Sequence, residues 1–315
     1  MTGREGPVLC VGEAMVLVSP IGSRALATAD AFEVTVAGAE ANVARFLADL
    51  GIESGGLSSV GHDPLGGRIL SNLSTCGVDT RWVAQAVESP TGAFFKDPAA
   101  TGSRVFYYRT GSAFSRMTAA DTARWPLERA CWVHVSGVTP ALSQGCLELT
   151  ATVLQRCRAA GVPVSFDVNY RPSLWAERDA ASVLLGIAVQ ADVVFVGLDE
   201  AQLLWGVTTA AHVAAYLSGA GIVVVKDSDR VATEFASSSA GGVITAVPAR
   251  KIADMVDPVG AGDAFAAGYL AELLRGRSAE ERLEMAHSVA AWTLSTSHDF
   301  RSGHGRSVRS LRGVA

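Results

Sequence analysis

The sequence predicts an α/β protein with a doubly wound, mostly parallel sheet flanked by helices, and a small β-sheet lid. Short apolar runs bounded by turn residues alternate with Ala/Leu-rich segments of helical period. These runs are continuous, as in strands that are buried on both faces. Two other segments alternate polar and apolar residues, which is typical of antiparallel strands with one solvated face. A chain of 315 residues is long enough for one large domain of this class.

The elements of the parallel sheet follow one another along the chain. Each predicted strand is a run of mainly apolar residues too short for a helix. The predicted strands are Val8–Val11, Val133–Val135, Val162–Val168, Val193–Val196 and Ile222–Val225. The helices expected between and after them are Asn42–Leu50, Leu65–Cys76, Gln144–Ala160, Ala180–Val189, Ala210–Leu217, Ala264–Arg275 and Ala279–Thr296.

Polar and apolar residues alternate in two segments, Ala31–Val36 and Thr91–Arg109. We expect these segments to form a β lid, from about residues 14–37 and 88–112, on a body of residues 1–300. The Gly/Ser/Arg-rich residues 301–315 are expected to form a flexible basic tail.

Composition narrows the class of protein. The formal net charge of −5 argues against nucleic acid as a partner, because phosphate binding needs a clustered basic face. No apolar run reaches the roughly 18 residues of a membrane span, and the N-terminus lacks an apolar signal region, so we expect no membrane partner and a cytoplasmic location. The five cysteines show no metal-binding spacing and are expected to be buried thiols.

A glycine loop carries the clearest chemistry. Gly260, Ala261 and Gly262 lie directly before a predicted helix, so their backbone N–H groups lie at the positive end of a helix dipole, which suits a phosphate. Asp263 lies beside this anion site. It is either simply a favoured first-turn residue or the base that takes a proton from an attacking hydroxyl during phosphoryl transfer. The chain has neither GxxxxGK[ST] nor the GxGxxG of dinucleotide-binding folds.

The segment Asp257–Phe265 resembles the signature of the ribokinase-like (PfkB-type) carbohydrate kinases. Val8–Met15 and Ala37–Ala44 resemble two other landmarks of that family, and the resemblance runs from about residue 8 to residue 300. It implies a sugar kinase that uses ATP and Mg²⁺, with a central sheet and a β lid through which a homodimer can form. A requirement for a monovalent cation stays open.

Two arginines indicate the class of sugar. Arg109 shares one face of the lid with Tyr107, and Arg171 lies just past the end of a predicted strand. Two guanidinium groups from separate segments match a carboxylate. The alternatives are that Arg109 is a solubilising edge-strand arginine and that Arg171 forms a structural ion pair.

Tyr107-Tyr108-Arg109 and Asn169–Trp175 also resemble segments of the 2-keto-3-deoxygluconate kinases. That resemblance implies a small sugar acid that is phosphorylated at its terminal hydroxyl. The pocket residues it implies are Gly38, Asn42, Phe94, Tyr107, Arg109, Arg171 and Asp299. Phe94 replaces a frequent tyrosine, and His298 stands where a glycine usually precedes Asp299.

The nucleotide side departs from the family pattern. Gly197-Leu198-Asp199-Glu200 keeps the glutamate of an Asn-x-x-Glu motif, so Glu200 is expected to hold Mg²⁺ through water. Lys226 is followed by Ser228 and Val231, where the family has glycines, so both positions are expected to need a positive φ. The residues assigned to the nucleotide by the resemblance are Asn169, Lys226, Ser228 and His287.

We therefore predict an ATP-dependent kinase of a 2-keto-3-deoxy sugar acid. One alternative is a kinase for a neutral ketose or pentose, such as fructose or ribose. Another is a sugar-acid-binding protein with impaired catalysis on a kinase scaffold. The choice between gluconate and galactonate stereochemistry stays open.

Overall fold

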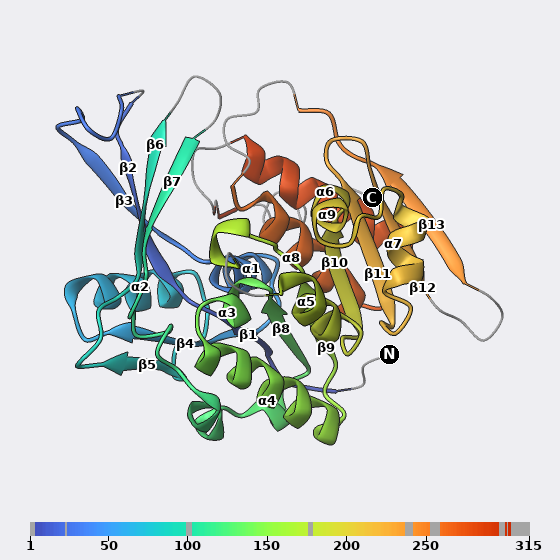
Figure 1. Ribbon diagram of the computed structural model, residues 1–315, viewed down its shortest axis with the longest axis horizontal. Coiled ribbons are helices and arrows are strands. Elements are labelled where there is room, and N and C mark those ends of the chain that lie inside the picture. Colours follow the sequence, from blue (N-terminus) through green and yellow to red (C-terminus); the bar gives the residue numbers. More distant parts are fainter. Residues whose placement is uncertain are drawn as a thin grey trace.

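The computed structural model describes residues 4–22, 24–98, 103–175, 179–236, 242–252, 259–295, 300 and 302–303 (Figure 1). Within these residues the larger sheet has nine strands in the order β13-β12-β11-β10-β9-β8-β1-β4-β5. From β11 to β5 neighbouring strands pair in parallel, whereas β12 and β13 continue the sheet antiparallel. The strands are β1 (Val8–Val11), β4 (Ser54–Gly61), β5 (Val83–Ala86), β8 (Trp132–Ser136), β9 (Val164–Asp167), β10 (Val193–Gly197), β11 (Ile222–Asp227), β12 (Val231–Ala236) and β13 (Val243–Pro248).

Helices cover both faces of this sheet and create two hydrophobic cores. Strand β1 shows the division, because Val8 and Cys10 belong to one core and Leu9 and Val11 to the other. The first core packs against α1 (Ala39–Asp49), α2 (Pro64–Thr75), α8 (Ala261–Leu274) and α9 (Ala279–Leu294). The second packs against α4 (Gln144–Ala160), α5 (Ala180–Ala188), α6 (Leu198–Trp205) and α7 (Ala210–Tyr216). The short helices are α3 (Val138–Ala141), η1 (Ala119–Arg124), η2 (Leu127–Arg129) and η3 (Pro172–Leu174). The predicted doubly wound α/β class is confirmed.

A second, four-stranded sheet projects from one side of the body (Figure 1). Its order is β3-β2-β6-β7, with β2 (Met15–Pro20), β3 (Phe32–Ala37), β6 (Ala93–Pro98) and β7 (Ser103–Tyr108). β2 pairs antiparallel with β3, as β6 does with β7, and a parallel pairing of β2 with β6 joins the two hairpins. These strands come from the two segments in which the sequence predicts a lid.

Some elements differ from the prediction. Helix α8 begins at Ala261 instead of Ala264, because Gly260 adopts a left-handed φ of 81° and serves as the N-cap. Four cysteines are buried, Cys76 is partly buried, and all five are free thiols. No helix in the described ranges is long and apolar enough to cross a membrane. Apart from residues 302–303, the predicted tail lies outside the described residues.

The buried His134 gives the fold a pH dependence. It lies on β8 at 1% exposure, with Nδ1 2.9 Å from Ser165 Oγ on β9. Burial lowers the pKa of His134 to about 4. The unfolded chain therefore binds this proton below about pH 6.5 and the folded chain only near pH 4, so stability is lost as the pH falls through this window.

We expect His134 to account for a loss of up to about 3 kcal/mol between pH 6.5 and pH 4. Denaturant unfolding of the wild type and of His134→Asn at several pH values checks this. The variant should lose less stability over the window, because it lacks the His134 contribution and keeps the other titrating groups. Parallel pH curves for the two proteins would show that His134 does not cause the loss.

Candidate active site

A cavity of about 690 Å³ opens where the carboxyl ends of the parallel strands meet the smaller sheet and α8. In open α/β sheets this edge is where ligands bind. Many of the predicted site residues line it together: Gly38, Asn42, Phe94, Tyr107, Arg109, Asn169, Arg171, Glu200, Lys226, Ser228, Gly260, Gly262 and Asp263. Ala261 lies in the first turn of α8, between two of these residues. Asp299 falls outside the described residues.

Asp263 lies in the first turn of α8, at the wall of this cavity. The first N–H groups of a helix have no partner within the helix, so the turn that begins after Gly260 presents donors to an anion. Asn42 on α1 donates from Nδ2 to Asp263 Oδ2 at 2.8 Å. The carboxylate of Asp263 and the N-terminus of α8 thus adjoin each other at the cavity wall.

Lys226 brings a positive charge to the same end of α8. Its Nζ donates to Asp167 Oδ2 at 3.1 Å and lies 3.7 Å from where a Cβ on Gly262 would be. Burial lowers the pKa of Lys226, but the negative charges of Asp167 and Glu200 outweigh burial and hold that pKa above its ordinary value. The lysine is therefore protonated at neutral pH, next to Gly262.

Glu200 organises two backbone turns. Its Oε1 accepts the N–H of Tyr170 and its Oε2 the N–H of Gly197, both at 2.8 Å. Burial raises the pKa of Glu200, and the nearby Lys226 only partly offsets this. Arg171 Nη1 lies 3.9 Å from Oε1. Glu200 thus orients the loop that carries Arg171. Its contact with Arg171 is a structural ion pair, which the sequence left open as an alternative role for this arginine.

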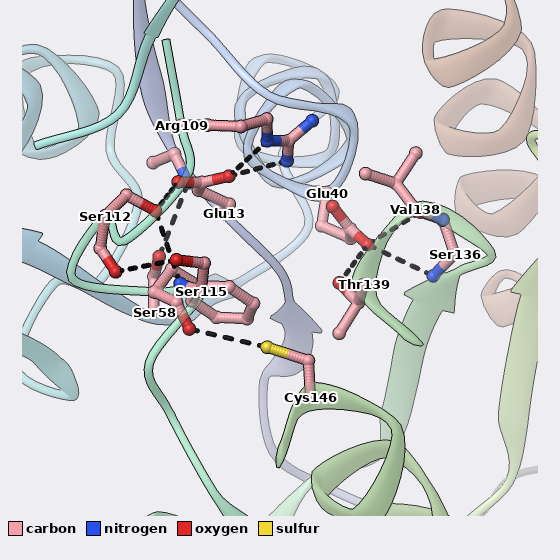
Figure 2. Close-up of polar contacts among 12 residues, drawn as sticks. Glu13, Glu40, Ser58, Arg109, Ser112, Ser115, Ser136, Val138, Thr139 and Cys146 are labelled. Atoms are coloured by element: carbon pink, nitrogen blue, oxygen red, sulfur yellow. Dashed lines mark hydrogen bonds and ion pairs between the residues drawn. The ribbon is translucent and has the colours of Figure 1, made fainter. Parts of the chain in front are cut away.

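Arg109 is held in a buried ion pair that the sequence reasoning also missed. It donates from Nε to Glu13 Oε2 at 2.7 Å, and Ser112 Oγ donates to Glu13 Oε1 (Figure 2). The side chains of Arg109 and Glu13 are 8% and 1% exposed. Tyr107 lies beside the guanidinium, and its ring is 5.5 Å from that of Phe94. The charge of Arg109 is therefore compensated, whereas the half-exposed Arg171 remains open to the cavity.

A second buried carboxylate, Glu40, anchors the start of α1. Its Oε1 accepts hydrogen bonds from the Ser136 backbone N–H, from Ser136 Oγ and from Thr139 Oγ (Figure 2). Burial raises the pKa of Glu40, and these donors only partly offset it. A Cβ on Gly12 would lie 2.0 Å from Glu40 Oε2, so a larger residue there would displace the Glu40 carboxylate. Glu40 thereby ties α1, which carries Asn42, to the end of β8.

The nucleotide-side predictions have mixed outcomes. Ser228 adopts the expected positive φ, at 46°, but the expectation for Val231 is wrong, because this residue begins the extended strand β12. Asn169 also has a positive φ, of 40°, which asparagine tolerates. His287 is not among the cavity residues. Its Nε2 lies 3.0 Å from the Val247 carbonyl oxygen, which places it between α9 and β13.

A helix terminus with unpaired N–H groups beside a carboxylate, at the carboxyl ends of parallel strands, is an arrangement that suits phosphoryl transfer to a small molecule. The chain belongs to the pfkB family of carbohydrate kinases, whose model matches residues 7–300. It is 35% identical to a 2-dehydro-3-deoxygluconokinase of Bacillus subtilis, over 89% of this chain and 87% of the relative. It is 31% identical to a 2-dehydro-3-deoxygalactonokinase of Haloferax volcanii, over 89% and 88%. A solved PfkB protein of Polaromonas sp. JS666 superposes with a TM-score of 0.82 at 34% identity, covering 98% of this chain and 99% of that one.

Proposed function

We propose that this protein transfers the γ-phosphate of ATP to the terminal hydroxyl of a 2-keto-3-deoxy sugar acid. The observation that carries the proposal is that Asp263, the N-terminus of α8 and Arg171 line one cavity. A carboxylate and an anion site serve phosphoryl transfer to a hydroxyl. Arg171, which is half-exposed and 3.9 Å from the nearest Glu200 oxygen, is placed to select an acidic sugar. The relatives named for 2-dehydro-3-deoxy sugar acids support the same substrate class.

In this proposal Asp263 accepts the proton of the sugar hydroxyl as its oxygen attacks the γ-phosphorus and ADP leaves. The N–H groups of Gly260, Ala261 and Gly262, with Lys226 beneath them, stabilise the charge on the transferring phosphoryl group. The smaller sheet acts as a lid that excludes water from ATP.

The residues around the cavity fit a nucleotide with Mg²⁺. Asn169 Oδ1 is buried and accepts no hydrogen bond from the part of the chain that the structure describes, so it is suited to a ligand donor. Asp167 and Glu200 are the carboxylates that would hold Mg²⁺, which binds through few protein ligands and retains water. When bound, Mg²⁺ neutralises phosphate charge.

A homodimer through the smaller sheet is part of the proposal. Phe106 and Tyr108 alternate with the cavity residue Tyr107 along β7, and they are 41% and 67% exposed. These apolar side chains support burial against a second copy. Light scattering that finds only monomers would exclude this dimer.

The role of Arg171 tests the substrate class. We expect Arg171→Ala to weaken binding of 2-keto-3-deoxygluconate by about 1.5–3 kcal/mol, roughly ten- to hundredfold, since it removes a charged hydrogen bond to the carboxylate. Titration calorimetry measures this, with Arg230→Ala as the control, because Arg230 is an exposed arginine paired with Asp227. Equal affinity of wild type and Arg171→Ala would remove Arg171 from carboxylate recognition.

A kinase for a neutral ketose is the second candidate. The observation that favours it is the Glu13–Arg109 ion pair, because an arginine that is already paired with a buried carboxylate is less available to a sugar carboxylate. Calorimetry with fructose and ribose separates the two candidates. Tight binding of a neutral sugar that is unaffected by Arg171→Ala would favour the second.

A further inference from the structure

Arg45 is a buried arginine close to the proposed base but outside the residues assigned to the site. It is 3% exposed, on the second turn of α1. Its Nη2 donates to the Val36 carbonyl oxygen at 2.8 Å and its Nη1 to Asn72 Oδ1 at 3.2 Å. Nη2 also donates to Asn42 Oδ1. These contacts reach β3, α2 and α1, so the guanidinium group is fixed from several sides.

The contact with Arg45 determines which way the amide of Asn42 points. A guanidinium group has only donors, so the amide atom that faces it must be the carbonyl oxygen. The NH₂ group of Asn42 is then directed away from Arg45, and it donates to Asp263 Oδ2 at 2.8 Å. Rotating the amide by half a turn would bring its oxygen against the carboxylate and its NH₂ against the guanidinium, both repulsive.

We propose that Arg45 is a positioning residue that acts through Asn42 to orient the carboxylate of Asp263. The inference deepens the proposed function and rests on Asp263 being the base. Arg45 lines no part of the proposed active-site cavity among the described residues, so its effect on turnover passes through Asn42. Asn42 itself lines the cavity, and its amide joins Arg45 to the base.

A double-mutant cycle, measured by steady-state kinetics, tests whether Arg45 acts on Asp263 through Asn42. We expect Arg45→Met to lower kcat by about ten- to hundredfold, the scale of a misplaced catalytic group, and to leave the KM for the sugar within about threefold. In the Asn42→Leu background, adding Arg45→Met should lower kcat no further, since the link is already broken. Full additivity of the two substitutions, or an unchanged kcat in Arg45→Met, would overturn the proposal.

A matched control separates positioning from loss of stability. Arg156 on α4 likewise donates to backbone carbonyl oxygens, at Thr122 and Trp125, away from the cavity. Arg156→Met should lower the melting temperature and keep kcat. A loss of kcat in Arg156→Met as large as in Arg45→Met would mean that any lost arginine impairs turnover, and it would overturn the proposal.

A spectroscopic readout keeps the test independent of turnover. The chain has three asparagines, Asn42, Asn72 and Asn169, so selective ¹⁵N-asparagine labelling gives three side-chain NH₂ pairs. The pair absent in Asn42→Leu should shift in Asp263→Ala and in Arg45→Met. If the wild type phosphorylates no sugar but both shifts occur, the proposed function fails and the coupling stands. If the chemical shifts of the Asn42 pair do not change in Arg45→Met, the coupling fails, whatever the activity.

Discussion

Replacing Asp263 by asparagine is expected to lower kcat by about 10²–10⁴-fold, the usual contribution of a general base. Asparagine keeps the size of the side chain and an oxygen that accepts the hydrogen bond from Asn42, but an amide cannot take the proton of the sugar hydroxyl. Sugar affinity should therefore change little. Steady-state ADP release gives kcat, and calorimetry gives the affinity.

The control for this substitution is Asp179→Asn. Asp179 caps the N-terminus of α5 by accepting the N–H of Ser182, and asparagine caps a helix equally well. This variant should retain full turnover. An Asp263→Asn enzyme with turnover close to that of the wild type would show that the reaction uses another base.

Breaking the buried ion pair of Arg109 with Glu13 is expected to have the largest effect on stability. Arg109→Ala should lower the free energy of unfolding by about 3–5 kcal/mol, because it leaves the Glu13 carboxylate buried without its cation. Denaturant unfolding measures the change. The double variant Glu13→Gln with Arg109→Met should recover much of the loss, since no unpaired charge then remains.

Arg104→Ala is the matched control on the same strand pair. Arg104 is 71% exposed and pairs with Asp97 across β6 and β7, so its removal should cost no more than about 1 kcal/mol. Similar losses for Arg104→Ala and Arg109→Ala would contradict the distinction between the exposed pair and the buried pair.

The sequence predicts the central strands well because each is a continuous apolar run, but it misses β4. This strand reads Ser-Gly-Gly-Leu-Ser-Ser-Val-Gly, a composition typical of loops, and yet it is buried throughout. A Cβ on Gly55 would lie 3.0 Å from the side chains of Leu9 and Trp82. The small residues are there because neighbouring side chains approach closely, and local sequence does not show that.

In the site, too, features made by neighbouring residues can be predicted from the sequence, whereas contacts between distant residues cannot. The glycine loop and Asp263 are contiguous, so their chemistry is readable from sequence. The ion pair of Glu13 with Arg109 spans 96 positions, and so does the contact of Glu40 with Ser136. One signal was available for Glu13, since it is an acid two positions after the wholly apolar strand β1, at the edge where ligands bind.

The most direct test of the central claim is ADP release with Mg·ATP in the presence of 2-keto-3-deoxygluconate, its galactonate epimer, fructose, ribose or no sugar, with Asp263→Asn as the blank. We predict ADP formation that depends on a sugar acid and disappears in the blank. Turnover confined to fructose or ribose would contradict the sugar-acid assignment. No turnover with any sugar, although calorimetry detects sugar-acid binding, would contradict kinase activity itself.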